Sequence, residues 1–232
     1  MSPVIVVTGT DTEVGKTVAT AAIAAALEAA GRTVVAYKPV QTGVGRDDEG
    51  DMPFVRRAAG VPATDGVRLR EPMAPVQAAA AEDRTLPSVG DQALAVRRLL
   101  TSADDVLVEG AGGLLVELDG AGATMADLAA HLDATVVVVV RAGLGTLNHT
   151  MLTLEALKAR SLTVGGLIVG AYPADPGPIE AANVTHLRNR VGVPVIGVIP
   201  SGVGAMASEE FREAAPAWIA ASDTLVARRP VR

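Results

Sequence analysis

The chain has 232 residues, 49% of them hydrophobic, which is enough for the core of one α/β domain. It contains no cysteine, which excludes disulfide bonds, thiolate metal sites and a cysteine nucleophile. A net charge of −6 without a clustered basic face argues against a nucleic-acid partner. We expect a cytoplasmic protein without membrane contact, because there is no signal peptide and no apolar run of about 20 residues.

Short apolar runs rich in β-branched residues predict buried strands, in chain order at Val4–Val7, Thr33–Tyr37, Asp105–Val108, Thr135–Val140, Val164–Val169 and Val195–Ile199. Helical patterns lie between them at Lys16–Ala30, Ser88–Leu100, Thr124–Leu132, Thr146–Arg160 and Ile179–Arg190. Because the strands lack polar alternation, both of their faces should be covered. We therefore predict an α/β fold, a doubly wound and mainly parallel sheet with helices on both faces. It would form a single domain over residues 1–232, with a C-terminal tail at about 222–232.

The first predicted strand leads into a glycine-rich loop, GTDTEVGKT, from Gly9 to Thr17. A strand, a glycine loop and a helix in this order are typical of a P-loop, whose backbone amides surround phosphate oxygens. Lys16 would reach the β- and γ-phosphates of a nucleoside triphosphate, and the Thr17 hydroxyl would bind Mg²⁺. The loop is one residue longer than GxxxxGK[ST], which can place Thr12 and Glu13 between the nucleotide and an acceptor. An ordinary glycine turn is the alternative, and both flanking elements argue against it.

Lys38 is predicted to end the second strand, since Pro39 restricts it to an extended backbone. A second cation beside Lys16 suits a reaction in which negative charge builds on a phosphoryl group and on an anionic acceptor. A solvated surface lysine is the alternative interpretation.

Acidic residues at other strand ends are candidates for a magnesium site, because Mg²⁺ takes one or two carboxylates in addition to phosphate oxygens. Glu109 follows the strand VLV and opens the turn EGAGG, so it is the strongest candidate. The loop Gly45–Asp51 adds Asp47, Asp48, Glu49 and Asp51, and their spacing alone does not choose among them.

Other patterns are less specific. The turn AGLGT before Leu147 and Asn148 could hold a carboxylate on free amides, or could be a plain tight turn. The segment TMAD, residues 124–127, is typical of a capping box with a structural role. The three histidines lack metal-ligand spacing, and no GxSxG motif indicates an α/β-hydrolase.

Four segments together closely resemble dethiobiotin synthetases: GTDTEVGKT, KPVQTG, VEGAGGLLVEL and GLGTLNHTMLTLEAL, in that order over nearly the whole chain. The resemblance implies an ATP- and Mg²⁺-dependent cyclo-ligase of biotin biosynthesis. It would convert 7,8-diaminononanoate and CO2 (or bicarbonate) to dethiobiotin through a carbamate and a carbamic–phosphoric anhydride. It also implies a homodimer in which the partner subunit holds the substrate's carboxylate.

The family positions carry over to the following residues. Catalysis is assigned to Lys16, Lys38 and Thr12, and the metal to Thr17, Asp51 and Glu109. Substrate contacts are assigned to Thr12, Thr42, Gly145, Thr146, Leu147 and Asn148. Nucleotide contacts are assigned to Glu13, Val14, Gly15, Lys16, Thr17, Val18, Asp51, Glu109, Gly110, Ala111, Gly112, Gly170, Ala171, Pro200, Ser201 and Gly202.

The chain departs from the family pattern after the fifth predicted strand, where Gly170 and Ala171 replace an Asn-Asp pair that reads adenine. The turn Pro200–Gly202 still matches the second base-contacting turn. We therefore expect nucleotide binding with relaxed base selectivity, so that other nucleoside triphosphates can replace ATP.

Two other P-loop classes are alternatives. A ParA-like partition ATPase would need a second lysine where this chain has Asp11, and also a basic DNA-binding surface. A cobyrinate amidase would need a glutaminase domain with a nucleophilic cysteine.

Overall fold

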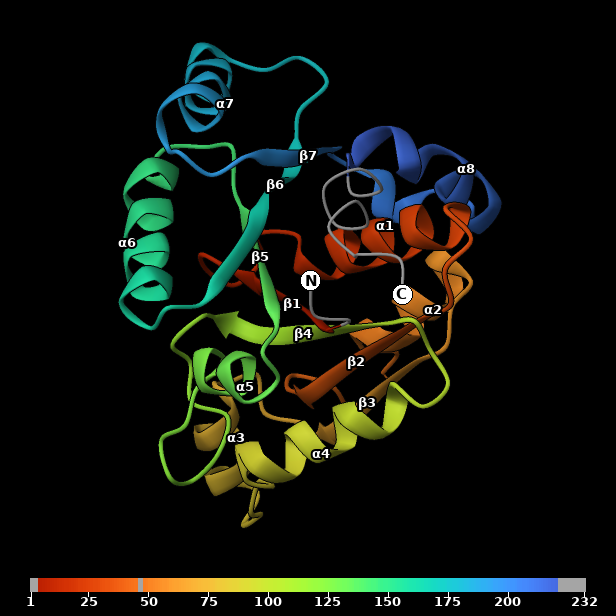
Figure 1. Ribbon diagram of the computed structural model, residues 1–232, viewed down its shortest axis with the longest axis vertical. Helices are drawn as coiled ribbons and strands as arrows, with labels where there is room; N and C mark the ends of the chain where they lie inside the picture. Colours follow the sequence, from red (N-terminus) through yellow and green to blue (C-terminus); the bar gives the residue numbers. More distant parts are fainter. Residues whose placement is uncertain (1–3, 46–47, 221–232) are drawn as a thin grey trace.

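The computed structural model describes residues 4–45 and 48–220, which form a seven-stranded parallel sheet in the order β3-β2-β4-β1-β5-β6-β7 (Figure 1). The strands are β1 (Val4–Gly9), β2 (Val34–Gln41), β3 (Ala63–Arg68), β4 (Asp105–Gly113), β5 (Thr135–Val140), β6 (Thr163–Tyr172) and β7 (Val195–Pro200). The helices are α1 (Lys16–Ala29), α2 (Asp51–Ala59), α3 (Pro75–Ala81), α4 (Val89–Leu99), α5 (Met125–His131), α6 (Thr146–Ala159), α7 (Pro178–Arg190) and α8 (Ser208–Trp218). The predicted doubly wound fold is confirmed.

Helices cover both faces of the sheet, which explains the uninterrupted valines of β5. Val137 and Val139 belong to the core cluster under α1, α2 and α8, and Figure 1 shows these three helices on one side of the sheet. Val136, Val138 and Val140 belong to the opposite cluster with residues of α4, α5, α6 and α7. Successive strand residues point to opposite faces, so a strand that is buried on both sides has no polar position.

All six predicted strands are present, but the sequence patterns miss β3. Its sequence, ATDGVR, contains aspartate, glycine and arginine, which are uncommon in strands. β3 is an edge strand and several of its residues are partly exposed, so the apolar pattern of a central strand is not required there. The sequence patterns also miss α3 and α8.

Several strands extend beyond their predicted ends, and two of these extensions contain predicted site residues. β2 continues to Gln41, so Lys38 lies inside the strand, and β4 continues through Glu109 to Gly113. Beyond Tyr37, β2 pairs only with β3, through Lys38 opposite Asp65. The missing N–H of Pro39 is tolerated in that segment because β4 no longer pairs with it.

The strand order places the first loop at the switch point of the sheet. β1 lies between β4 and β5, with β2, β3 and β4 on one side and β5, β6 and β7 on the other. Ligands of such sheets bind outside the carboxyl ends of the strands at this point. The loop after β1 is the predicted P-loop, so it lies where the topology predicts a ligand site.

All described strands belong to one sheet, which supports our proposal of a single domain. The predicted tail at about 222–232, and Asp47 of the acidic loop, lie outside the described residues. Within residues 4–45 and 48–220, no helix is both long and apolar enough to cross a bilayer.

Candidate active site

The P-loop joins β1 to α1 and folds back over its own lysine. Gly15 begins α1 with a left-handed backbone, φ 92°, which glycine adopts without strain. The Lys16 ammonium donates a hydrogen bond to the Asp11 carbonyl at 2.8 Å, and the Thr10 amide donates to the Val139 carbonyl on β5 at 3.0 Å. These bonds hold the loop against the sheet while the N-terminus of α1 stays open to the cavity described below.

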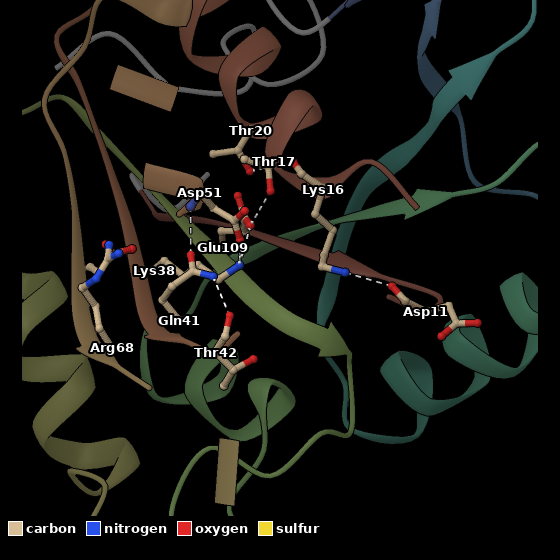
Figure 2. A network of polar contacts seen from close by, with 11 residues as sticks. Asp11, Lys16, Thr17, Thr20, Lys38, Gln41, Thr42, Asp51, Arg68 and Glu109 are labelled. Carbon is tan, nitrogen blue, oxygen red and sulfur yellow. Dashed lines mark hydrogen bonds and ion pairs between the residues drawn. The ribbon is translucent and has the colours of Figure 1, made fainter. Parts of the chain in front are cut away.

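A buried lysine lies between two carboxylates beside this loop (Figure 2). The Lys38 ammonium donates to Glu109 Oε1 at 2.8 Å and also pairs with Asp51. The Thr17 hydroxyl donates to the same Glu109 oxygen at 3.0 Å. Lys38 is 5% exposed and Glu109 is fully buried. Strands β2 and β4, the P-loop and the start of α2 thus bring together four residues that the sequence analysis selected.

The two lysines have different electrostatic surroundings. Burial lowers the pKa of Lys38, but the charges of Glu109 and Asp51 outweigh it, so the pKa is raised. Burial also lowers the pKa of Lys16, and the positive charge of Lys38 acts in the same direction. Lys16 donates to a neutral carbonyl, whereas Lys38 pairs with two carboxylates.

The acidic loop after β2 contributes one carboxylate to this cluster. Asp48 accepts a hydrogen bond from the Gly45 amide at 2.7 Å, and Glu49 pairs with Arg57 on the surface. Among the acids of this loop that the structure describes, Asp51 is the one that contacts Lys38. This supports the choice of Asp51 over its neighbours.

Gln41 positions Asp51, a role that no motif of the sequence predicts. Its side-chain carbonyl accepts a hydrogen bond from the Asp51 amide at 2.9 Å, and its amide donates to the Thr42 carbonyl at 3.0 Å. Gln41 is 5% exposed. The sequence feature that could have identified Gln41 is its place in the turn KPVQTG. Its hydrogen bond to a residue ten positions later, however, cannot be predicted from spacing.

A cavity of about 540 Å³ lies over the cluster. Of the predicted site residues it is lined by Thr12, Glu13, Gly15, Lys16, Thr17, Val18, Lys38, Thr42, Asp51, Glu109, Ala111 and Gly112. It is also lined by Gln41, Gly43, Val44 and Gly50, to which no role was assigned. The lining combines cations, carboxylates and glycine backbone, as expected for a phosphorylated ligand.

A second cavity of about 390 Å³ shares Thr12, Thr42 and Gly112 with the first. It adds less polar residues, including Pro72, Met73 and Pro75. The two cavities therefore meet at the segment of the P-loop that the sequence analysis placed between nucleotide and acceptor.

Several predicted nucleotide contacts lie outside the lining of the first cavity: Val14, Gly110, Gly170, Ala171, Pro200, Ser201 and Gly202. Gly170, near the end of β6, instead packs against the P-loop. A Cβ added to Gly170 would overlap the Val14 carbonyl oxygen, and a Cβ on Gly15 would lie 2.8 Å from the Gly170 oxygen. The two glycines permit the close approach of β6 to the loop.

We expect Gly170→Ala to displace the P-loop, because the added methyl group has no space beside Val14. The expected result is a loss of about 2 kcal/mol or more in unfolding free energy, together with weaker nucleotide binding. Denaturant unfolding and calorimetric titration of ATP measure the two effects. Gly120→Ala is the control, since a Cβ there meets nothing within 4 Å. Unchanged binding and stability would contradict the packing argument.

The predicted carboxylate-binding turn stands apart from both cavities. None of Gly145–Asn148 lines them, and α6 begins at Thr146 after Gly145, whose φ is 91°. Leu144, beside it, is 82% exposed. Arg141, at the start of the same turn, donates to Asp11 of the P-loop at 2.6 Å. The capping box at the start of α5 is confirmed, because Asp127 accepts hydrogen bonds from the Thr124 amide and hydroxyl.

The residues present fit a magnesium ion. Glu109 Oε2 is buried without a hydrogen-bond partner in the described part of the chain, and the Thr17 hydroxyl lies against the other oxygen of the same carboxylate. No group of three or more acidic, histidine or cysteine side chains suited to a metal occurs within residues 4–45 and 48–220. Two carboxylates and a hydroxyl suit Mg²⁺, which takes its remaining ligands from phosphates and water.

Comparisons with known proteins agree with this site. The profile of the AAA_26 family, described as an AAA domain, matches residues 4–205. The chain is 48% identical over 219 residues to an ATP-dependent dethiobiotin synthetase of Streptomyces coelicolor, covering 94% of this chain and 92% of the relative. It is 51% identical over 209 residues to the enzyme of the same name from Mycobacterium avium, and the match covers 90% of this chain and 91% of the relative.

Two solved structures at 16% identity share the fold of this chain. The cell division protein MinD of Aquifex aeolicus has a TM-score of 0.58 at 16% identity, covering 99% of this chain and 98% of that one. FtsY of Thermotoga maritima has a TM-score of 0.56 at 16% identity, and the match covers 92% of this chain and 68% of that chain. The ParA-like alternative is not favoured, because the relatives that match at far higher identity are synthetases. From its P-loop, its buried lysine and carboxylate cluster and these relatives over nearly its whole length, we conclude that the chain belongs to the ATP-dependent dethiobiotin synthetase family.

Proposed function

We propose that this protein closes 7,8-diaminononanoate and CO2 to the cyclic urea dethiobiotin with consumption of ATP. The observation that carries the proposal is the pair of buried lysines at one cavity, one on the P-loop and one on β2. Two cations suit a step in which an anionic acceptor attacks an anionic phosphoryl group, since each group needs neutralisation before the two can approach.

The P-loop would bind the triphosphate. The free amides at the start of α1 and the Lys16 ammonium face the cavity, where they can hold the β- and γ-phosphates. Among residues 4–45 and 48–220, the Lys16 ammonium donates to the Asp11 carbonyl alone, and it can exchange this contact for a phosphate oxygen. The location in the cytoplasm that the sequence predicts stays part of the proposal.

The acceptor would lie where the two cavities meet. One substrate amine adds CO2 to form a carbamate and releases a proton, and a carbamate oxygen then attacks the γ-phosphorus and displaces ADP. The second amine attacks the carbonyl carbon of the mixed anhydride, which closes the ring and expels phosphate. Thr12 and Thr42 line both cavities and can donate hydrogen bonds to the carbamate, while Lys38 neutralises it. Most of the rate enhancement would come from holding the two reactants in line.

Thr17, Asp51 and Glu109 would hold Mg²⁺, with the orphaned Glu109 oxygen as a ligand. When bound, the ion would neutralise charge on the phosphates.

A single assay tests the proposal. The protein is incubated with diaminononanoate, bicarbonate, Mg²⁺ and ATP, and the products are analysed by mass spectrometry. We expect dethiobiotin and ADP in equal amounts. If no dethiobiotin forms at high enzyme concentration, the proposal is wrong. ADP release without dethiobiotin would favour an ATPase such as the ParA-like alternative.

We also propose a homodimer that forms through α6. Leu144, Met151 and Leu152 are large hydrophobic residues of this helix and its preceding turn, and they are 82%, 43% and 57% exposed. Apolar side chains gathered on one surface are typical of an interface. The resemblance to the family implies that the partner's Gly145–Asn148 turn would bind the substrate's carboxylate, and such an arrangement would require the two subunits to meet there.

We expect Leu152→Glu to convert the dimer to a monomer, because a charge would be buried in the apolar contact. Size-exclusion chromatography with light scattering measures the mass. Leu94→Glu is the matched control, since Leu94 is 53% exposed on α4, away from α6. A dimer that persists in Leu152→Glu, or dissociates equally in Leu94→Glu, would contradict the proposed interface.

We further propose relaxed nucleobase selectivity, because Gly170 and Ala171 cannot supply an amide side chain to read adenine. The packing of Gly170 on Val14 supports this, since it leaves no space for a side chain. We expect single-turnover rates with ATP, CTP and GTP to agree within about tenfold, because discrimination rests on hydrogen bonds that only a polar reader makes. Rapid-quench measurements test this, and a strong preference for ATP alone would refute it.

A further inference from the structure

A buried amide on α7 holds the turn that precedes α6. Asn183 is 9% exposed, and its side-chain nitrogen lies 2.8 Å from the Ala142 carbonyl oxygen and 3.1 Å from that of Gly143. Both neighbours are carbonyl oxygens, which only accept hydrogen bonds, so the NH2 group must face them. One side chain, 40 residues away in sequence, thus donates to two consecutive peptide groups of the turn.

The turn lies between Arg141, which is bonded to Asp11, and the first residue of α6, Thr146. Its Gly143 carbonyl also accepts from the Thr146 amide, but at 3.3 Å, and Gly145 has a left-handed backbone. The Thr146 hydroxyl is buried and has no partner among the described residues, so it does not fasten the turn. Asn183 therefore supplies the two side-chain hydrogen bonds that fix the course of the backbone into α6.

The direction of these two hydrogen bonds affects how an anion would bind near the start of α6. A carboxylate near the start of α6 is attracted by its free amides and repelled by nearby carbonyl oxygens. The Asn183 amide holds the Ala142 and Gly143 carbonyl oxygens, so these two oxygens are directed toward α7. A correctly directed set of amides lowers the reorganisation needed when the anion binds.

We propose that Asn183 is a positioning residue for substrate recognition, which holds the turn Ala142–Gly145 so that the amides at the start of α6 bind the substrate's carboxylate. The inference rests on the proposed function, because the ligand is the carboxylate of 7,8-diaminononanoate bound across the dimer. Asn183 does not touch the reacting atoms. Its loss should weaken binding of the carboxylate and leave the phosphoryl chemistry largely intact.

The experiment compares two diamines in the full-length dimer. One is 7,8-diaminononanoate, and the other is 2,3-diaminononane, which has the same vicinal amines and chain but no carboxylate. The variants are Asn183→Asp, which presents oxygen atoms to the two carbonyls, and Asn183→Leu, which fills the same space without a donor. Asn189→Asp is the matched control, because Asn189 is exposed on the same helix.

We expect both Asn183 variants to raise KM for diaminononanoate by about 10- to 100-fold, with kcat changed less than about threefold. The KM for ATP and the kcat/KM for 2,3-diaminononane should stay at the wild-type values. Hydrogen exchange measured by mass spectrometry should be faster in the peptide covering residues 141–150 and unchanged elsewhere. Asn189→Asp should behave as the wild type in all these measurements.

Other outcomes would overturn the inference. These are an unchanged KM for diaminononanoate, an equal loss with both diamines, or loss of the fold in both variants, since the residue would then serve the core in general. If the wild-type enzyme converts neither diamine, the proposed function itself fails. The exchange data would then still report whether Asn183 orders the turn.

Discussion

Replacing Lys38 by methionine is expected to lower kcat by about 10²- to 10³-fold while KM for ATP changes less than about threefold. Methionine retains the apolar stem of the side chain and removes only the ammonium group. The proposed partner of that group is the carbamate, which forms after the nucleotide has bound, so the loss should fall on the chemical step. Single-turnover kinetics with a titration of ATP separate binding from chemistry.

The same substitution should also lower stability. Lys38 is the buried counter-charge of Glu109, at 2.8 Å, and its loss leaves the carboxylate without a cation. Breaking a buried pair in this way costs about 3–5 kcal/mol, so the thermal midpoint should fall by roughly 10 °C. Kinetics are therefore measured well below that midpoint. Lys158→Ala is the control, because Lys158 is an exposed residue near the end of α6.

One result would contradict the role of Lys38 at the carbamate. If Lys38→Met weakened ATP binding as strongly as it lowered kcat, the lysine would serve the nucleotide rather than the acceptor. Lys38 would then bind the nucleotide as Lys16 does, and the proposal that Lys38 acts on the carbamate would be wrong.

Glu109→Gln is expected to abolish most activity by removing a magnesium ligand. We expect kcat to fall by at least about 10²-fold and the Mg²⁺ concentration for half-maximal activity to rise by at least about tenfold. Glutamine has the size of glutamate and keeps a carbonyl oxygen that can accept from Thr17. Its amide nitrogen, however, cannot coordinate a cation where the orphaned Oε2 now lies.

Metal binding can be measured apart from turnover. Mn²⁺ titrated into the protein with ADP and followed by electron paramagnetic resonance should bind more weakly to Glu109→Gln than to the wild type. Glu117→Gln is the control, since Glu117 is an exposed residue a few positions beyond the end of β4. Equal Mn²⁺ affinity in wild type and Glu109→Gln would exclude Glu109 as a ligand, and the kinetic loss would then arise from its contact with Lys38.

The P-loop and the central strands could be predicted from the sequence because their signals are local. The run Val4–Val7, the glycines of the loop and the capping box at Thr124 each depend on neighbours a few residues away. Fold class follows from the same signals, since apolar runs without polar alternation require cover on both faces. β3 escaped prediction because an edge strand tolerates the polar residues that a central strand excludes.

The sequence therefore identifies the chemical groups Lys16, Thr17, Lys38 and Glu109 and the glycine-rich loop that carries the first two, but it places the ends of β2 and β4 too early. The tertiary structure decided which of these groups meet. Lys38 and Glu109 are 71 residues apart, and they pair because the strand order places β2 beside β4. The contacts of Gly170 with Val14 and of Asn183 with the turn before α6 depend in the same way on packing between elements distant in sequence. Such contacts arise from strand order and side-chain direction, and neither is encoded in a local pattern.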